Sequence, residues 1–228
     1  MPSLILVRHG QGSFGGASYD VLSDVGHAQA GVVAAALDDR NLRVEKVLSG
    51  SLRRQLNTAE AIAAPMGADV EVDDRWNEYD TGDIFEHHST SAAREERGPG
   101  ATAPAVSSRE FQVLLEAALL AWIAAGGSGP ARETFAAFST RVLAALASAA
   151  ADLPAGGTAV VCTSGGVLGV VCMSLLGVAP SSVVAFNRTT INTGLTKIAV
   201  GRSGMTLVSF NEHGHLDAAG DPALLTYR

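Results

Sequence analysis

Short apolar runs alternate with longer segments of helical periodicity along most of the chain. The short runs predict buried strands at residues 4–7, 44–49, 70–72 and 159–162. Apolar positions three and four apart predict helices over residues 28–37, 52–66, 111–125, 135–151 and 167–176, with Ser23 or Asp24 as the first N-cap. Strands that alternate with helices predict an α/β fold, a three-layer α/β/α sandwich around a mostly parallel sheet.

Two segments depart from this alternation. Residues 196–200 and 206–210 predict a late strand pair that is joined through residues 202–204. Residues 76–105 are polar and irregular and contain two Gly and two Pro near their end. Because regular patterns resume on both sides, we interpret this stretch as part of a helical and loop excursion over the site, at about 76–130. The chain is then expected to be a single domain, 1–228.

Composition indicates a globular protein with an ample core. Of the 228 residues, 47% are hydrophobic and 17% are charged, whereas disorder requires the opposite balance. The net charge of −7 argues against nucleic acid or an anionic membrane as the main partner. An anionic substrate would need a local cluster of cations.

Cysteine usage and the uncharged stretches bear on location. Cys162 and Cys172 both lie in apolar runs, which indicates core thiols in a reducing compartment. The first residues show no signal-peptide pattern, so we expect a cytoplasmic protein. Residues 158–179 carry no charge, but residues 163–166 divide them into a strand, a turn and a helix. We therefore expect no membrane-spanning helix.

Chemically useful residues follow the predicted strands. These stretches are Arg8-His9-Gly10, residues 49–54, the region of Glu78 and residues 163–166. In an open parallel sheet, functional groups gather beyond the carboxyl ends of the strands. Two arginines, a histidine, a carboxylic acid and a glycine-flanked helix start suit phosphoryl transfer. Each of them alone has an ordinary structural reading.

Their order resembles the signature of the histidine phosphatase superfamily, which has the phosphoglycerate-mutase-like fold. A strand followed by Arg8-His9-Gly10 is similar to its first motif. Residues 22–30 resemble its Leu-Thr/Ser-x-x-Gly-x-x-Gln-Ala segment, and residues 51–59 contain a match to Leu-x-Arg-Ala-x-Gln-Thr-Ala. Residues 77–82 contain a match to Glu-x-x-x-Gly, and residues 192–193 and 210–216 look like its C-terminal strands. The resemblance runs from about residue 4 to residue 216.

The resemblance implies a metal-independent phosphatase that acts on a small phosphorylated metabolite through a phosphohistidine. In that mechanism His9 is the nucleophile and Glu78 is the proton donor. Arg8 and Arg54 bind the phosphoryl oxygens, while Arg53 stands at a variable position. No cofactor or metal is implied, and we do not assign His213 and His215 to a metal site, since two histidines make an incomplete ligand set.

Ser164 is the main departure from the family pattern. The family usually has Ser-His-Gly-Gly where this chain has Thr163-Ser164-Gly165-Gly166. The sequence is similar to a branch that reads Thr-Ser-Gly-Gly there and Arg-His-Gly-Gln at the start. We expect Ser164 and Gly165 to bind phosphate at a helix start. Loss of a charged donor costs roughly 1.5–3 kcal/mol, about ten- to a hundred-fold in rate. Alternatively, Ser164 is only a helix N-cap.

Other hypotheses stay open at this point. A non-catalytic phosphate-binding or interaction module would keep the arginines and His9 without hydrolysis. A serine hydrolase with Ser164 as nucleophile fits less well, because Cys162 replaces the first glycine of Gly-x-Ser-x-Gly. His87 and His88 are either a solvated loop pair or a substitute for the missing imidazole. Substrate identity and oligomeric state, a homodimer included, are not determined.

Overall fold

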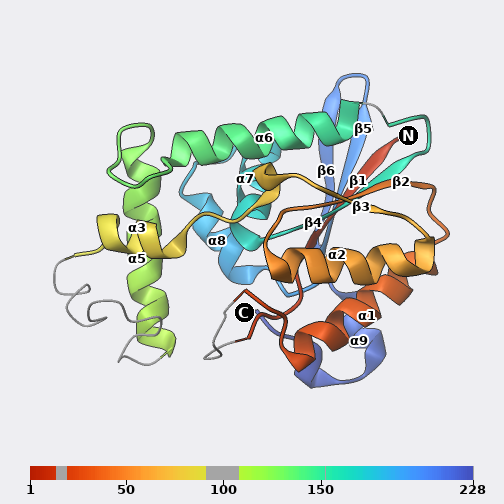
Figure 1. Cartoon of the computed structure of the whole chain (residues 1–228). Coiled ribbons are helices and arrows are strands. Elements are labelled where there is room, and N and C mark those ends of the chain that lie inside the picture. Colours follow the sequence, from red (N-terminus) through yellow and green to blue (C-terminus); the bar gives the residue numbers. More distant parts are fainter. Residues whose placement is uncertain (14–19, 91–107, 152, 228) are drawn as a thin grey trace.

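A central sheet organises the part of the chain that the computed structural model describes, residues 1–13, 20–90, 108–151 and 153–227. Six strands form this sheet in the order β3-β2-β4-β1-β5-β6 (Figure 1). Their bounds are β1 Ser3–Arg8, β2 Val44–Ser49, β3 Val70–Val72, β4 Thr158–Thr163, β5 Leu195–Gly201 and β6 Gly204–Glu212. The strands that the apolar runs predict are therefore all present, whereas residues 192–193, expected in a C-terminal strand, form a turn before β5.

Strand direction divides the sheet into two parts. Strands β3, β2, β4 and β1 are parallel to one another, whereas β5 pairs antiparallel with β1 and with β6. Parallel neighbours need a long crossover, but β5 and β6 are joined through Arg202 and Ser203, which suffice only for a hairpin. The parallel strands thus end at one common edge, and that edge carries the candidate site.

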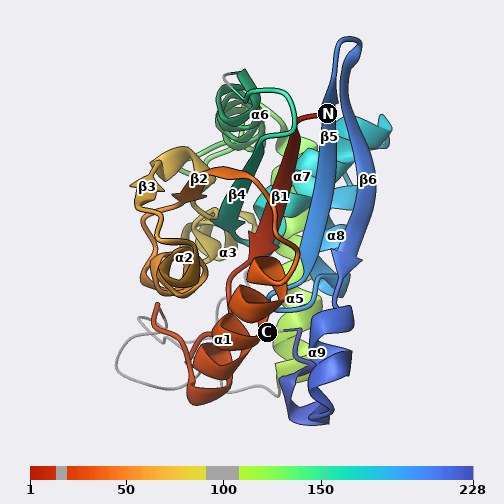
Figure 2. The same ribbon diagram turned by 90° about the vertical axis from the view of Figure 1, so that its right-hand side faces the viewer.

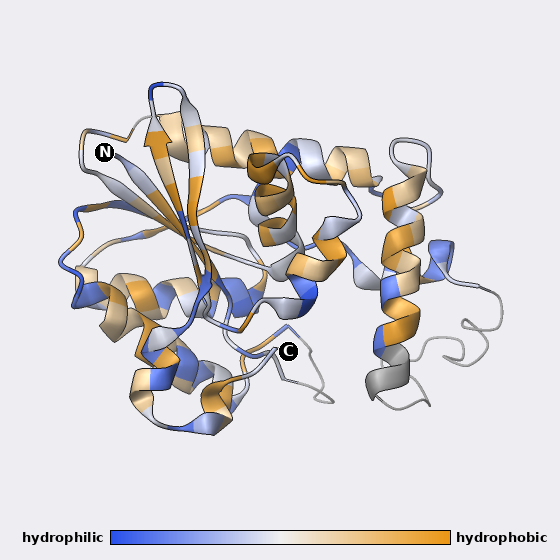
Figure 3. Cartoon of the chain, turned by 180° about the vertical axis from the view of Figure 1, so that it is seen from behind, coloured by the Kyte–Doolittle hydropathy of each residue, from blue (hydrophilic) through white to orange (hydrophobic). Residues whose placement is uncertain are grey.

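Helices cover both faces of the sheet (Figure 2). One face carries α1 Asp24–Asp38 and α2 Arg53–Met66; the other carries α6 Phe135–Ala151, α7 Gly165–Leu176 and α8 Ser182–Thr189. Alternate residues of β1 serve the two cores. Leu4 and Leu6 pack on the α6–α7 side, and Ile5 and Val7 on the α1–α2 side. The three-layer sandwich is confirmed, and Figure 3 shows strongly apolar residues on the central strands.

Helix ends follow the signals in the sequence. Ser23 is the N-cap of α1, and its hydroxyl accepts a hydrogen bond from the Gly26 amide at 3.0 Å. Helix α2 stops at Gly67, which adopts the left-handed conformation with φ of 62°. Both ends lie at or beside the positions that the sequence predicts.

The excursion contains more helix than its polar sequence suggests. Helix α3 Thr81–His88 and helix α5 Ser108–Ala125 lie side by side at one end of the molecule, beyond the sheet (Figure 1). The Asp80 carboxylate caps α3 by accepting from the Asp83 amide at 3.0 Å. An irregular stretch over all of 76–105 was therefore a wrong expectation. Residues 91–107 of this excursion, like residues 14–19 of the first loop, lie outside the described residues.

The C-terminal part holds two further differences. Helix α8 was not predicted, because it is only eight residues long and only Val183 and Val184 of these are buried. Residues 210–216 do not form one strand: β6 ends at Glu212, and α9 Gly214–Ala219 follows it. Leu216 of α9 is buried in a small apolar cluster that includes residues of α1, which favours the helix over a longer strand. Short 3₁₀ turns occur at Asp74–Trp76 and Pro222–Leu224.

The cysteines are buried and unpaired, as expected for core thiols. Burial raises the pKa of Cys172 to about 12 and that of Cys162 further still. No helix in the described part of the chain is long and apolar enough to cross a membrane.

Candidate active site

The carboxyl ends of β1 and β4 bring two of the predicted site segments together. Arg8 lies opposite Thr163 in the parallel ladder, and the His9 amide donates to the Thr163 carbonyl at 2.9 Å. The next residue after β4 is Ser164, the N-cap of α7. His9 and Ser164 thus follow neighbouring strands at the same edge of the sheet.

His9 is held as a neutral imidazole with a defined tautomer. Its Nδ1 lies 2.7 Å from the Gly10 carbonyl, which can only accept, so Nδ1 carries the proton. Nε2 is then the lone-pair nitrogen, and it accepts a hydrogen bond from Arg54 Nε at 3.1 Å. Burial, followed by the charges of Arg54 and Arg8, holds the pKa of His9 well below its usual value. Nε2 is therefore available as a nucleophile at neutral pH.

Arg54 and Arg53 have different environments, as the register of the motif implies. Arg54 is 9% exposed, whereas Arg53 is exposed to solvent. Asp20 joins the two: its carboxylate pairs with Arg54 Nη1 at 2.7 Å and accepts from the Arg53 amide at 3.0 Å. The sequence did not indicate a role for Asp20, because a single acidic residue before the Leu22-Ser23 motif is a weak signal.

Arg8 is bound by carbonyl groups from the C-terminal part of the chain. Its Nη1 donates to the carbonyls of Thr190 and Tyr227, the latter at 2.8 Å. The end of the chain is anchored in turn by Gln29, whose amide nitrogen donates to the Leu224 carbonyl at 2.7 Å. The C-terminus accordingly lies near the carboxyl ends of the parallel strands (Figure 1). Nothing in the sequence signalled that these last residues would reach Arg8.

The residues of the second motif support the His9 loop. Gln29 of α1 accepts from the Gln11 amide at 2.8 Å. A Cβ atom on Gly26 would lie 2.1 Å from the Gln11 carbonyl oxygen, so only glycine allows this close approach. Thr58 of α2 accepts from the Gly10 amide at 3.0 Å. These motif residues therefore fix the backbone around His9 and leave the chemistry to other groups.

Glu78 lies at the N-terminus of α7. Its Oε2 accepts from the Gly166 amide at 2.9 Å, and its Oε1 accepts from the Tyr79 amide at 3.2 Å. Burial raises the pKa of the Glu78 carboxyl, although these amides and the charges of Arg54 and Arg8 oppose the rise. Gly166 lies two residues after Ser164 at the start of α7, so Glu78 is at the same end of the sheet as His9. A carboxyl with a raised pKa is suited to donate a proton.

Arg141 of α6 holds the backbone beside Glu78. Its Nη1 donates to the carbonyls of Asn77 at 2.8 Å and Arg75 at 2.9 Å. Its Nε and Nη2 form a two-pronged ion pair with Glu133 at 2.6 and 2.9 Å. The turn that carries Glu78 is therefore tied to α6 by a guanidinium that no motif in the sequence indicated.

The glycines after Ser164 are required by close packing. A Cβ on Gly165 would lie 2.1 Å from Asn187 Oδ1, and one on Gly166 would lie 2.3 Å from the Tyr79 ring. Gly165 thus faces α8, and the amide of Gly166 binds Glu78. The first turn of α7 therefore binds the carboxyl group of Glu78, the predicted proton donor.

Ser164 is 1% exposed and has an unexpected partner. Its Oγ accepts a hydrogen bond from Gln55 Nε2 at 2.8 Å, and its side chain makes no capping bond to its own helix. The N-cap alternative therefore lacks its defining bond. A serine nucleophile requires a base as partner, and the described partner of Ser164 is an amide, which is no base.

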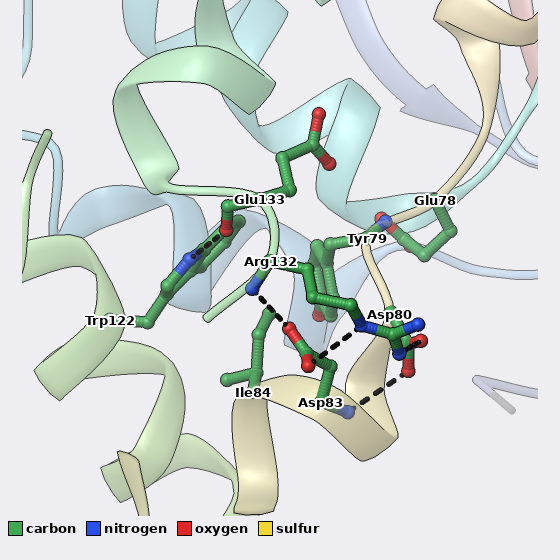
Figure 4. Close-up of a pocket in the computed structure, with 8 residues that line it drawn as sticks. All are labelled: Glu78, Tyr79, Asp80, Asp83, Ile84, Trp122, Arg132 and Glu133. Atoms are coloured by element: carbon green, nitrogen blue, oxygen red, sulfur yellow. Dashed lines mark hydrogen bonds and ion pairs between the residues drawn. The ribbon is translucent and has the colours of Figure 1, made fainter. Parts of the chain in front are cut away.

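A cavity of about 250 Å³ adjoins Glu78 (Figure 4). Its apolar wall contains Tyr79, Ile84 and Trp122, and its polar rim contains Asp80, Asp83, Arg132 and Glu133. Arg132 pairs with Asp83 at 2.9 Å and with Asp80 at 2.6 Å. We call this cavity the leaving-group pocket, for the use proposed below.

Among the other histidines, His87 and His213 bind nearby backbone carbonyls. His87 Nδ1 lies 2.9 Å from the Asp83 carbonyl, and burial lowers the pKa of His88. Nothing in the described residues links this pair to His9. His213 binds the Asn211 carbonyl at 2.8 Å. Within the described ranges, no group of three or more His, Cys, Asp or Glu side chains is arranged to hold a metal ion.

Comparison with known proteins identifies the family. The chain belongs to the histidine phosphatase superfamily (branch 1), whose family model matches residues 4–213. A comparison with curated proteins finds no significant match.

Several solved structures share the fold. A phosphoserine phosphatase from Entamoeba histolytica, solved as a mutant with phosphoserine, has a TM-score of 0.65 and 22% identity over 95% of this chain and 100% of its own. A mycobacterial glucosyl-3-phosphoglycerate phosphatase with inorganic phosphate has a TM-score of 0.66 and 22% identity over 93% and 98%. YhfR from Bacillus stearothermophilus has a TM-score of 0.66 and 18% identity over 95% and 100%. At these identities the likeness concerns the fold.

Proposed function

We propose that the protein is a phosphatase that hydrolyses the phosphate ester of a small metabolite through a phosphohistidine on His9. One observation carries this proposal: Nδ1 of a neutral, buried His9 is held by the Gly10 carbonyl while Nε2 faces Arg54. This arrangement presents an unprotonated nitrogen beside a permanent cation. It is the combination that attack on an anionic phosphoryl group needs.

In the first step, His9 Nε2 forms a bond to phosphorus as the ester oxygen leaves. The Arg54 Nε–H, which meets Nε2 at 3.1 Å, transfers its hydrogen bond to a phosphoryl oxygen. Arg8 supplies a second positive charge to the same group. Glu78 gives its proton to the leaving oxygen, which departs as a neutral alcohol.

In the second step, water replaces the imidazole. Glu78, now a carboxylate, takes a proton from the water molecule as its oxygen attacks phosphorus. The N–P bond breaks, the electron pair returns to Nε2, and inorganic phosphate is released. The amides of Gly166 and Tyr79 hold the Glu78 carboxyl group in both steps.

The leaving-group pocket next to Glu78 is where we place the alcohol part of the substrate. The proton donor lines this pocket, so a group attached to the ester oxygen would extend into it. Its apolar wall and ion-paired rim favour a compact alcohol with both apolar and polar atoms. Two structural relatives are named as phosphatases of phosphoserine and of glucosyl-3-phosphoglycerate, small compounds that agree with this size class. A cytoplasmic location stays a prediction.

A non-catalytic phosphate-binding module is the second candidate, because Ser164 contributes no positive charge to the site. The test is a screen of phosphoamino acids, phosphorylated hydroxy acids, sugar phosphates and an aryl phosphate, run beside His9→Ala. We expect phosphate release by the wild type and loss of it in the variant. When the reaction with a good substrate is stopped rapidly without acid, mass spectrometry should show added phosphate on the peptide that contains His9. Undiminished turnover in His9→Ala would refute the mechanism, and no turnover with tight phosphate binding would favour the module.

A further inference from the structure

Two departures from the family pattern contact each other in the fold. Aligned with Leu-x-Arg-Ala-x-Gln-Thr-Ala, this chain has Gln55 where the pattern has alanine, and it has Ser164 where the family has its second histidine. These residues are 109 positions apart, yet Gln55 Nε2 lies 2.8 Å from Ser164 Oγ. Gln55 is 0% exposed and Ser164 1% exposed. Gln55 is larger than the alanine of the family pattern, and Ser164 is smaller than the histidine of that pattern.

The direction of this hydrogen bond is determined by a third group. Gln55 Nε2 also donates to the Trp76 carbonyl at 3.1 Å, and a carbonyl can only accept. The amide nitrogen must therefore face Trp76, and its second hydrogen points to Ser164. Gln55 Oε1 is left buried with no partner among the described atoms, a cost that indicates a need for the donor end.

The Ser164 hydroxyl consequently acts as an acceptor toward Gln55 and keeps its own proton for another group. A hydroxyl has one proton and two lone pairs, and Gln55 uses only a lone pair. Ser164 follows Thr163, whose carbonyl binds the His9 amide at 2.9 Å. The proton of Ser164 is thus available at the same sheet edge as the nucleophile.

We propose that Gln55 is a positioning residue that, together with Ser164, replaces the family's second imidazole. Gln55 fixes the Ser164 oxygen and leaves its O–H to donate to a phosphoryl oxygen. This inference rests on the proposed phosphatase function for its kinetic consequences. Gln55 does not itself touch the substrate, because both hydrogens of its amide are engaged by Trp76 and Ser164.

The same geometry leaves no room for a histidine at position 164 while Gln55 is present. An imidazole at position 164 is larger than a hydroxyl and would extend from the Ser164 Cβ into the space of the Gln55 amide, whose nitrogen already lies at 2.8 Å from Oγ. Restoring histidine alone should therefore fail. Restoring it together with the alanine of the family pattern, as Gln55→Ala with Ser164→His, provides the room that the ring needs.

The experiment compares kcat, KM and the affinity for inorganic phosphate in a set of variants. Ser164→Ala and Gln55→Met should each lower kcat by about ten- to a hundred-fold, because each removes the oriented donor. The pair Gln55→Met/Ser164→Ala should lie within about threefold of the weaker single variant, as expected for residues that act as one unit. Losses that simply multiply would overturn the proposal.

The exchange of pairs gives the second readout. Gln55→Ala/Ser164→His should exceed Ser164→His by about tenfold or more in kcat, because removal of the Gln55 amide gives the imidazole the space that it needs. Equal activity of these two variants would contradict the proposal. The matched control is Asn57→Gln, which restores the glutamine of the family pattern at the other position where this motif departs from it. Asn57 faces Glu60 at 3.2 Å on the exposed side of α2, so this change should have little effect on activity.

Failure of the phosphatase proposal can be distinguished from failure of this one. If the wild type hydrolyses nothing in the screen, calorimetric titration with inorganic phosphate replaces kinetics. Ser164→Ala and Gln55→Met should then weaken phosphate binding non-additively, and additive or absent effects would refute the pair. Gln55→Met keeps the volume of the side chain, and thermal unfolding of each variant checks that the fold is retained.

Discussion

The phosphate end of the site and the leaving-group pocket are built in different ways. His9, Arg8 and Arg54 are between 7% and 9% exposed and follow or lie beside the ends of parallel strands. In the pocket, by contrast, the side chains of Arg132 and Asp80 are 76% and 57% exposed. The phosphate end is embedded in the sandwich, whereas the pocket is assembled from α3, α5 and the segment before α6.

This difference separates chemistry from substrate choice. Groups at the phosphate end are held by partners from distant parts of the chain, such as Asp20, Thr190 and Tyr227. The ion pair of Arg132 with Asp80 in the pocket is exposed and contributes little to stability, because solvent screens it. Substitutions at the phosphate end should therefore slow the reaction of every substrate. Substitutions in the pocket should change which substrates are preferred.

Glu78 lies where the two regions meet, and its loss should reduce catalysis more than the loss of Arg54, Arg141 or Arg132. Glu78→Gln should lower kcat for alkyl phosphates by about 10²- to 10⁴-fold and by less for an aryl phosphate, whose leaving group needs no proton. Because the pKa of Glu78 is raised, kcat/KM of the wild type should fall as pH rises through that pKa. The variant should lack this fall. Equal losses for both kinds of ester would mean that Glu78 is not the acid.

Arg54 tests the phosphate end without touching the pocket. Arg54→Ala should cost about 2–4 kcal/mol of transition-state binding, roughly 30- to 900-fold in kcat/KM, for every substrate in a panel. Arg53→Ala is the matched control, because the Arg53 side chain is exposed and only its backbone amide binds Asp20. A similar loss in both variants would show that the register of the motif has been misread.

Arg141 connects the regions by holding the turn before Glu78. Arg141→Ala should lower kcat for alkyl phosphates by about tenfold, with a smaller loss for an aryl phosphate, because it displaces the acid and not the nucleophile. Arg75→Ala is the control: that side chain pairs with Asp73 at 2.7 Å, and only the Arg75 carbonyl contacts Arg141. A loss independent of the leaving group would mean that Arg141 acts on the fold in general.

Arg132 should give the smallest effect and the one that depends most on substrate. Arg132→Ala should change KM by at most about fivefold, to different extents for different alcohols, with kcat nearly unchanged. Arg43→Ala removes another exposed arginine, one that is paired with Glu45, and serves as the control. A uniform loss of kcat across the panel would place Arg132 in the chemistry and remove the distinction between the regions.

Local sequence patterns predicted most of the fold. Apolar runs and helical spacing located every strand and the principal helices, because burial against a two-sided sheet imposes these patterns. The patterns missed α3 and α8 and misassigned residues 214–216, since these short helices bury few side chains. The motifs also assigned phosphate binding to Arg54 and not to Arg53, and in the structure Arg54 is the buried one of the two and contacts His9.

The sequence thus indicated which side chains take part in the chemistry, while the tertiary structure decided which residues contact them. Residues at strand ends can be recognised from the sequence, because their neighbours in the chain carry the strand and turn signals. The contacts of Asp20 with Arg54, of Tyr227 with Arg8 and of Gln55 with Ser164 join positions 34 to 219 residues apart. No local pattern encodes such contacts, because they arise only when the sheet and its helices close around a shared edge.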